Sequence, residues 1–300
     1  MKLKLAILSL GLSVAVINCK QDELIETNEV SSKPSSERVA AVYGEGPDGH
    51  TVTFNRSNQN YNNSLAGTDF GNIDNLREAV NTKIENNTLK VRIPKNTWSD
   101  SDLPVGDGLR FNTDIDDGSE YELSYKIKFD SNFKWSAGGK SGPGLVIGKG
   151  NSGCSAAIKD GAGIRVMWDG AGRKENEINE AYFQPYLYYV DKNSNCGDNF
   201  GAKSDRLKKN VWYTVYMRVK CNTGSSDNGS VFVSIKEGSN AAKTLYSDSR
   251  FRWTNTSSTD SNRLVKELSW NTFRGGKESY WASSTDDYIY YDDIKWRKIN

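Results

Sequence analysis

The sequence predicts an all-β protein, a two-sheet jelly roll or sandwich with one concave cleft. Many short runs alternate apolar and polar residues and end at Gly, Asn or Asp, which is the pattern of half-buried strands separated by turns. The composition agrees, because 15 Tyr, 8 Trp and 27 Gly suit strands and turns. The mean hydropathy of -0.68 is typical of a chain with long polar loops.

The strands follow one another without a repeat or a second domain boundary. The clearest is 121–129, where Tyr, Leu, Tyr, Ile and Phe alternate with polar residues. The other expected strands are 51–54, 89–93, 161–168, 182–190, 212–221, 231–235, 264–273 and 288–295, with a short helix at 73–80. We therefore predict one jelly-roll domain over 41–300.

The N-terminus predicts export. Lys2 and Lys4 precede an apolar run at 5–17, which is too short to span a bilayer and fits a signal peptide. The run ends at Cys19 in a pattern that resembles a bacterial lipoprotein box, although Asn18 is larger than the usual residue. The alternative is an ordinary secretory signal with a chance cysteine.

The lipoprotein resemblance implies a signal peptide over 1–18 and diacylation of Cys19. It further implies an outer-membrane lipoprotein, anchored by its lipid and exposed at the cell surface, since acidic residues follow the cysteine. Residues 19–40 are rich in Ser, Glu and Asn and are expected to form a flexible tether. A monomer is expected.

The other cysteines predict a disulfide and no transition-metal site. An exported protein folds in an oxidising compartment, and Cys154 and Cys196 both lie in Gly-, Ser- and Asn-rich loops. Cys221 falls on the apolar phase of a strand and is expected to be a core thiol. No Cys-x-x-Cys or His cluster is present. The net charge of +1 gives no global field for nucleic acid or membranes.

Three further chemistries have weak candidates. His50 is the one histidine and lies in a Gly-rich stretch, so His-based catalysis would depend on it alone. Glu177 and Glu180 resemble a glycoside hydrolase motif loosely, because Asn179 stands where an Asp is required. Structural calcium is an open alternative at four C-terminal aspartates, namely Asp286, Asp287, Asp292 and Asp293.

The stretch 135–189 gathers cations and phenols. Lys140 lies in a glycine-rich segment that is expected to form a turn, and Arg165 lies on a strand. Tyr186 and Tyr188 are two residues apart and point to one face of their strand. Each of these features has an ordinary explanation when taken alone.

Their order resembles family 14 polysaccharide lyases and the related glucuronan lyases of family 20. The resemblance covers roughly 85–297 and includes Gly-Gly-Lys at 138–140, the strand at 163–168 and Tyr-x-Tyr at 186–188. It implies a jelly roll that cleaves a uronate polymer such as alginate by β-elimination without a cofactor. Lys140, Arg165, Tyr186 and Tyr188 match the family's catalytic positions, whereas Gly163 stands where several members carry serine.

The chemistry of β-elimination fits these residue types. A cation is needed to stabilise the charge that develops on the uronate carboxylate, and Arg165 is suited to this with Asn271 or Arg274 assisting. A base must take the C5 proton and an acid must protonate the leaving oxygen, for which Lys140 and the tyrosines are candidates. Trp168 is predicted to contact substrate. The alternatives are a non-catalytic glycan-binding lipoprotein and a glycoside hydrolase.

Overall fold

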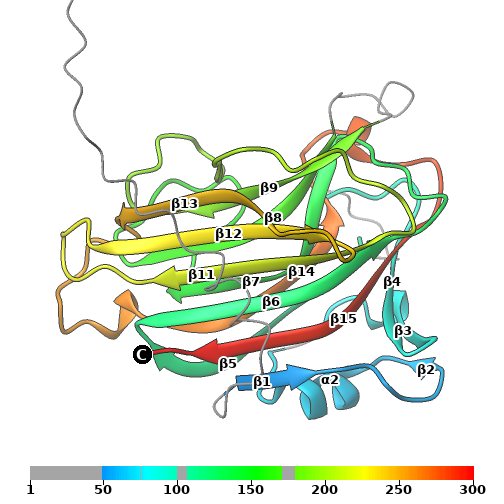
Figure 1. Ribbon diagram of the computed structural model, residues 1–300, viewed down its shortest axis with the longest axis horizontal. Helices are drawn as coiled ribbons and strands as arrows, with labels where there is room; N and C mark the ends of the chain where they lie inside the picture. The colour runs from blue at the N-terminus through cyan, green and yellow to red at the C-terminus, as the bar shows by residue number, and fades with distance from the viewer. Residues whose placement is uncertain (1–48, 75, 100–106, 171–179) are drawn as a thin grey trace, which may run out of the picture. The chain divides into compact units, whose positions relative to one another are not determined.

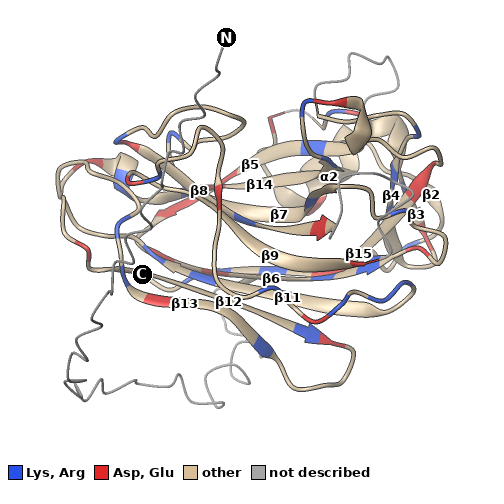
Figure 2. Ribbon diagram, turned by 90° about the horizontal axis from the view of Figure 1, so that it is seen from above, with Lys and Arg blue, Asp and Glu red and all other residues tan. Residues whose placement is uncertain are grey.

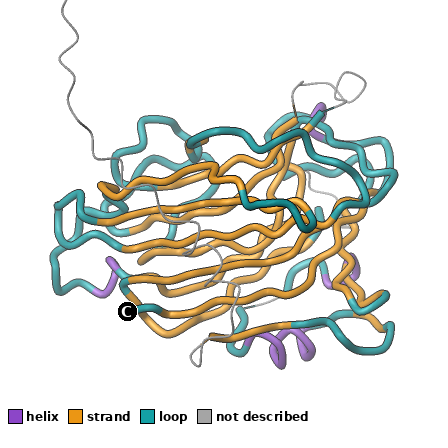
Figure 3. The backbone as a smooth tube through the Cα atoms, in the orientation of Figure 1, coloured by secondary structure: helices purple, strands orange, loops and turns teal. Residues whose placement is uncertain are grey.

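The computed structural model describes residues 49–74, 76–99, 107–170 and 180–300, and these fold into two antiparallel sheets. In Figure 1 the larger sheet faces the viewer and the smaller one lies behind it, and Figure 2 shows the two layers from above. Strands are the main regular structure of the described chain (Figure 3). The predicted all-β, two-sheet jelly roll is confirmed.

The larger sheet has nine strands in the order β13-β12-β11-β6-β15-β4-β3-β2, with β1 paired to β15. Their bounds are β1 Gly49–Val52, β2 Gln59–Asn60, β3 Thr82–Glu85, β4 Thr88–Ile93, β6 Glu120–Phe129, β11 Trp212–Lys220, β12 Gly229–Glu237, β13 Lys243–Phe251 and β15 Asp287–Lys298. The central pair β6 and β11 runs in register without a bulge over nine residue pairs.

The smaller sheet has six strands in the order β10-β9-β8-β7-β14-β5. Their bounds are β5 Leu109–Gly118, β7 Gly138–Gly148, β8 Gly161–Gly170, β9 Ala181–Tyr188, β10 Asp198–Asn199 and β14 Val265–Arg274. All of its neighbouring strands are antiparallel. Each strand therefore has one face toward the nine-stranded sheet and one face away from it.

The core lies between the two sheets and is rich in aromatic rings. Every second residue of β6 and of β8 points inward, because successive side chains of a strand lie on opposite faces. One aromatic cluster joins strands of both sheets, and its members are Phe129, Phe133, Trp135, Trp168 and Phe183. Burial of these large rings supplies much of the hydrophobic free energy that holds the sheets together.

The helical content differs from the sequence prediction. The helix expected at 73–80 is absent apart from one 3-10 turn, Ala79–Asn81. An α-helix, α2, instead spans Asn63–Phe70, where Asn62 caps the first turn by accepting a hydrogen bond from the Leu65 amide. Its low apolar content hid it from a periodicity argument.

The predicted signal peptide and tether lie outside the described residues, so both stay predictions. Among the residues that the structure describes, no helix is long and apolar enough to cross a membrane.

Candidate active site

The glycine-rich segment around Lys140 is a bulged strand, so the prediction of a turn is wrong. Lys140 pairs with Met167 and Leu145 pairs with Ile164, which places five residue steps of β7 against three of β8. Gly142 adopts φ +112, a region that favours glycine, and a Cβ there would lie 2.9 Å from the ring of Tyr291. The bulge interrupts the pairing beside Lys140, a common arrangement next to functional sites.

We use the name outer face for the side of the six-stranded sheet that points away from the core. Cross-strand partners share a face, and this places Lys140, Met167 and Gln184 in one row across β7, β8 and β9. Arg165 and Tyr186 form the next row. Met167, Tyr186 and Tyr188 form a small apolar cluster that is separate from the main core. The outer face thus combines cations with aromatic rings.

The cations lie over the rings. The Nζ of Lys140 is 4.9 Å from the ring centroid of Tyr186, and the Cζ of Arg165 is 5.6 Å from that of Tyr188. The two tyrosine rings are nearly perpendicular, with centroids 5.5 Å apart. The residues that the sequence predicted to act together on β7, β8 and β9 are therefore neighbours.

Among the described residues, Arg165 is a buried cation without an anionic partner. The residue as a whole is only 7% exposed. Within the described ranges no carboxylate forms an ion pair with it, and its Nε has no hydrogen-bond partner. A buried charge is costly unless it is paired. A guanidinium in this state can accept an anion of a ligand as its partner.

The charges also change the acidity of their neighbours. Burial, together with the nearby charges of Arg165 and Arg110, lowers the pKa of Lys140 to about 7. A large fraction of this amine is then neutral near pH 7 and able to accept a proton. Burial, followed by the proximity of Tyr188, raises the pKa of Tyr186 above its ordinary value, so its phenol stays protonated and can donate.

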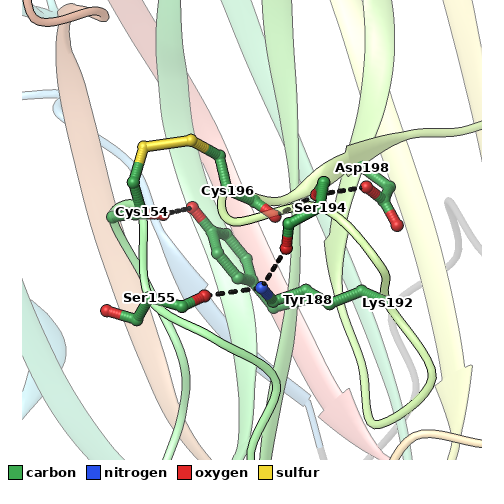
Figure 4. The surroundings of a disulfide bond; sticks show 8 residues. Cys154, Ser155, Tyr188, Lys192, Ser194, Cys196 and Asp198 are labelled. Carbon is green, nitrogen blue, oxygen red and sulfur yellow. Dashed lines mark hydrogen bonds between the residues drawn. A yellow bond between two sulfur atoms is a disulfide. The ribbon is translucent and has the colours of Figure 1, made fainter.

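A disulfide braces the strand end at Tyr188. Cys154 and Cys196, the pair that the sequence predicted, are bonded and connect the loop after β7 to the loop after β9 (Figure 4). The Tyr188 hydroxyl donates to the carbonyl of Gly153, the residue before Cys154, over 2.8 Å. The buried ammonium of Lys192 donates to the carbonyls of Ser155 and Ser194, which lie on both sides of the bond. Both loops are thereby held against the outer face.

Removing this disulfide is expected to lower the free energy of unfolding by about 2–4 kcal/mol, because the bond closes a long loop in the unfolded chain. The measurement is urea unfolding of the Cys154→Ser/Cys196→Ser variant against the oxidised protein. Dithiothreitol should shift the midpoint of the wild type and leave that of the variant in place. A variant that unfolds at the same urea concentration as the oxidised wild type would contradict the expectation. Cys221 is free and buried, as predicted. Its thiol is the same in the wild type and the variant, so it does not contribute to the difference between them.

Two predicted substrate contacts are corrected by burial. Trp168 lies in the aromatic core, is 0% exposed and donates its indole N–H to the carbonyl of Trp135, so it does not reach the outer face. Arg274 is also fully buried, and its guanidinium pairs with Asp287 in the interior. Asn271 does lie on the outer face, opposite Gly142.

The weaker sequence candidates lie elsewhere. His50 is exposed on β1, and its ring packs against that of Trp296 with centroids 4.3 Å apart. Glu180 accepts a hydrogen bond from Tyr182 and pairs with Arg206, while Glu177 lies outside the described residues.

The four C-terminal aspartates have separate partners, as in the pairs Asp287 with Arg274 and Asp293 with Lys126. In the described part of the chain, no group of three or more His, Cys, Asp or Glu residues is placed to hold a metal ion.

The outer face contains residues that the sequence analysis missed. Met167 and Gln184 complete the row of Lys140, and the ring of Phe273 lies 5.7 Å from the Lys140 Nζ. Arg110 stacks on Phe273 at 3.8 Å and pairs with Asp107. A parity argument would have found Gln184, because it is two residues before Tyr186 on the same strand.

Comparison with known proteins identifies relatives of the same architecture. The structure of alginate lyase Aly36B has a TM-score of 0.73 and 35% identity, covering 85% of this chain and 99% of that one. The alginate lyase of Aplysia kurodai has a TM-score of 0.63 and 20% identity, covering 82% of this chain and 99% of that one. The alginate lyase vAL-1 from Chlorella virus has a TM-score of 0.60 and 22% identity over 78% and 95% of the two chains.

A curated sequence relative and a family model also match. Exolysin of Paramecium bursaria Chlorella virus 1 is 29% identical over 176 residues, which is 51% of this chain. The match spans 25% of exolysin, so this chain corresponds to about a quarter of that relative's length. The model named Polysaccharide lyase 14 matches residues 81–294, which include every residue of the outer face discussed above. The predicted resemblance is therefore confirmed, and the chain belongs to polysaccharide lyase family 14.

Proposed function

We propose that this protein is a lyase that cleaves a uronate-containing polymer, of alginate or glucuronan type, by β-elimination. The observation that carries the proposal is the buried guanidinium of Arg165, which has no anionic partner among the described residues. An arginine fork binds a carboxylate through two hydrogen bonds, and every sugar of a polyuronate carries one. The substrate would supply the missing charge.

Carboxylate binding prepares the proton transfer. Abstraction of the C5 proton moves negative charge onto the C6 carboxylate, and Arg165 is placed to stabilise that charge as it develops. Lys140 lies beside it, with a pKa lowered to about 7 by burial and by the neighbouring arginines. We assign the neutral amine of Lys140 as the base that takes this proton.

The leaving group requires an acid, and we assign Tyr186. Its raised pKa keeps the phenol protonated, and its ring centroid lies 4.9 Å from the Lys140 Nζ. As the C5–H bond breaks, a C4–C5 double bond forms, the C4–O4 bond breaks and O4 receives the proton of Tyr186. Tyr188 already donates to Gly153, so we assign it the role of supporting the Tyr186 ring. None of these steps requires a cofactor.

The relatives favour alginate as the first polymer to test. Variants of Aly36B in which one lysine and one tyrosine, or one lysine and one methionine, are replaced by alanine were solved with an alginate tetrasaccharide or trisaccharide. The outer face of this chain has a lysine, a methionine and a tyrosine in adjoining rows, namely Lys140, Met167 and Tyr186. That arrangement supports an alginate-like ligand on this face.

The deciding experiment is a spectroscopic assay on alginate, polyglucuronate and other uronate polymers, run with and without a chelator. β-Elimination creates a double bond conjugated to the carboxylate, so ultraviolet absorbance should rise equally in both samples. New reducing ends without absorbance would instead indicate a hydrolase and refute the proposal.

The second candidate function is a non-catalytic glycan-binding module. The observation that favours it is Gly163, which stands where several lyases of the family carry serine, opposite Tyr188 on the outer face. A Cβ at Gly163 would lie 3.2 Å from the Leu145 carbonyl, so a serine fits with a small adjustment. Binding of polymer without any product, and a gain of absorbance in Gly163→Ser, would select this alternative.

We further propose that the protein is an exported monomer, anchored in the outer membrane through lipid on Cys19 and exposed at the cell surface. The support is the basic start, the apolar run and the cysteine at its end. Expression of Cys19→Ala in a lipoprotein-processing host is expected to release the protein into the soluble fraction with an altered N-terminal mass. Equal membrane retention of the variant and the wild type would contradict lipid anchoring.

A further inference from the structure

Gln184 is a second buried polar group on the outer face with unused hydrogen-bonding capacity. The residue is 8% exposed, and its Oε1 has no hydrogen-bond partner among the residues that the structure describes. It lies on β9 opposite Met167, which in turn lies opposite Lys140. Buried amides are nearly always satisfied in folded proteins, so this one calls for an explanation.

The same face holds two more such atoms among the described residues, the Nε of Arg165 and the Nε of Arg110. An unmade hydrogen bond of a buried group costs stability in the free protein. The unpartnered atoms of Gln184 and Arg165 lie on neighbouring strands, in adjacent rows of one face. This arrangement indicates that both groups form hydrogen bonds with a bound ligand. Arg165 has a role in the function proposed above, whereas Gln184 has none.

The position of Gln184 indicates which part of the ligand it meets. Gln184 and Tyr186 are two residues apart on one face of a strand, a spacing of roughly 7 Å. That distance is comparable to one pyranose ring with its linking oxygen. Gln184 shares its row with Lys140, so it lies within about one sugar of the bond on which Lys140 and Tyr186 act.

The chemistry of the amide selects hydroxyl groups. An amide offers both a donor and an acceptor, and a carboxylate can satisfy only the donor. A sugar hydroxyl both donates and accepts, so it satisfies the amide in either of its two orientations. Deep burial fixes the side chain, so the fit depends on the direction in which each hydroxyl leaves the ring.

We propose that Gln184 is a specificity-determining residue that binds hydroxyl groups of the bound polyuronate and distinguishes epimers by the orientation of these hydroxyl groups. This inference rests on the proposed lyase function. It adds a substrate contact on the Lys140 side of Tyr186 and makes Gln184 a binding residue with no part in proton transfer.

The test is Gln184→Met, which keeps the length of the side chain and removes the amide. On mannuronate-rich and guluronate-rich alginate, or on the polymer that the wild type cleaves, KM should rise roughly tenfold while kcat changes less than threefold. The ratio of kcat/KM between epimeric substrates should move toward one. The melting temperature should stay the same or rise, because a buried unsatisfied group is removed.

Ser234→Ala is the matched control. Ser234 lies on β12 of the other sheet, is 1% exposed and also has an unpartnered side-chain oxygen among the described residues. Its replacement should affect the melting temperature in the same direction and leave KM unchanged.

The outcomes separate the two proposals. If the wild type cleaves a uronate polymer and Gln184→Met keeps its KM and epimer ratio, the role of Gln184 is refuted and the lyase function stands. If Gln184→Met melts well below the wild type, the amide is structural and the inference is also refuted. If the wild type neither cleaves nor binds any uronate polymer, the lyase function fails and the role of Gln184 fails with it.

Discussion

Replacing Lys140 with alanine is expected to lower kcat on the cleaved uronate polymer by about 10²–10⁴-fold, the usual contribution of a positioned general base. Lys140 is the amine on the outer face whose pKa is lowered to about 7, so its neutral form is present at the pH of the assay. Its removal leaves no comparable base beside Arg165. The measurement is the steady-state rate of ultraviolet absorbance at saturating polymer.

The role of Lys140 as a base also predicts the direction in which kcat/KM changes with pH. The base must be unprotonated, so kcat/KM of the wild type should be low in acid, rise with pH and level off above about 7. The raised pKa of Tyr186 keeps the acid protonated over the same range, so no fall is expected there. The rise of kcat/KM between acid and neutral pH reports the pKa of Lys140 in the free enzyme, because kcat/KM follows the ionisation of unliganded groups.

Two substitutions separate charge from proton transfer. Lys140→Arg keeps the positive charge but cannot lose its proton near neutral pH, so it should be as slow as Lys140→Ala. Lys208→Ala is the control, since Lys208 is an exposed lysine that pairs with Glu237 away from the outer face. Substantial activity in Lys140→Arg with an unchanged pH profile would show that Lys140 supplies charge alone.

Much of the fold and part of the site follow from a local rule. Side chains alternate along a strand, so the sequence of β8 and β9 is enough to place Arg165, Tyr186 and Tyr188 on one kind of face. The same rule argues against Trp168, which is three residues from Arg165 and therefore on the opposite face. The prediction that Trp168 contacts substrate did not follow this rule, and the structure places Trp168 in the core as the rule requires.

The rest depends on contacts between distant segments. The segment around Gly142 has the composition of a turn, yet the close approach of the Tyr291 ring and pairing with β14 hold it as a strand. The lowered pKa of Lys140 arises from burial, from Arg165 and from Arg110, and Arg110 lies on β5, a strand that the sequence analysis did not predict. No local pattern reports such a charge, because the two residues meet only after the sheet has formed.

Arg165→Met is expected to lower kcat by about 10²–10³-fold, which is the usual cost of losing one group that stabilises developing negative charge. It should not lower the free energy of unfolding, because it removes a buried cation that has no carboxylate partner among the described residues. Arg165→Lys should recover little activity, since an ammonium cannot reproduce the two-pronged contact of a guanidinium.

The buried Arg274 provides the matched control for this separation. It is buried like Arg165, with 0% against 7% of the residue exposed, but it pairs with Asp287 inside the protein, so Arg274→Met leaves a carboxylate without its cation. Breaking such a pair should lower the free energy of unfolding by about 3–5 kcal/mol. The kcat of the molecules that remain folded should change far less than in Arg165→Met. If Arg165→Met instead unfolds early and keeps its kcat, Arg165 is a structural residue and the carboxylate must be bound elsewhere.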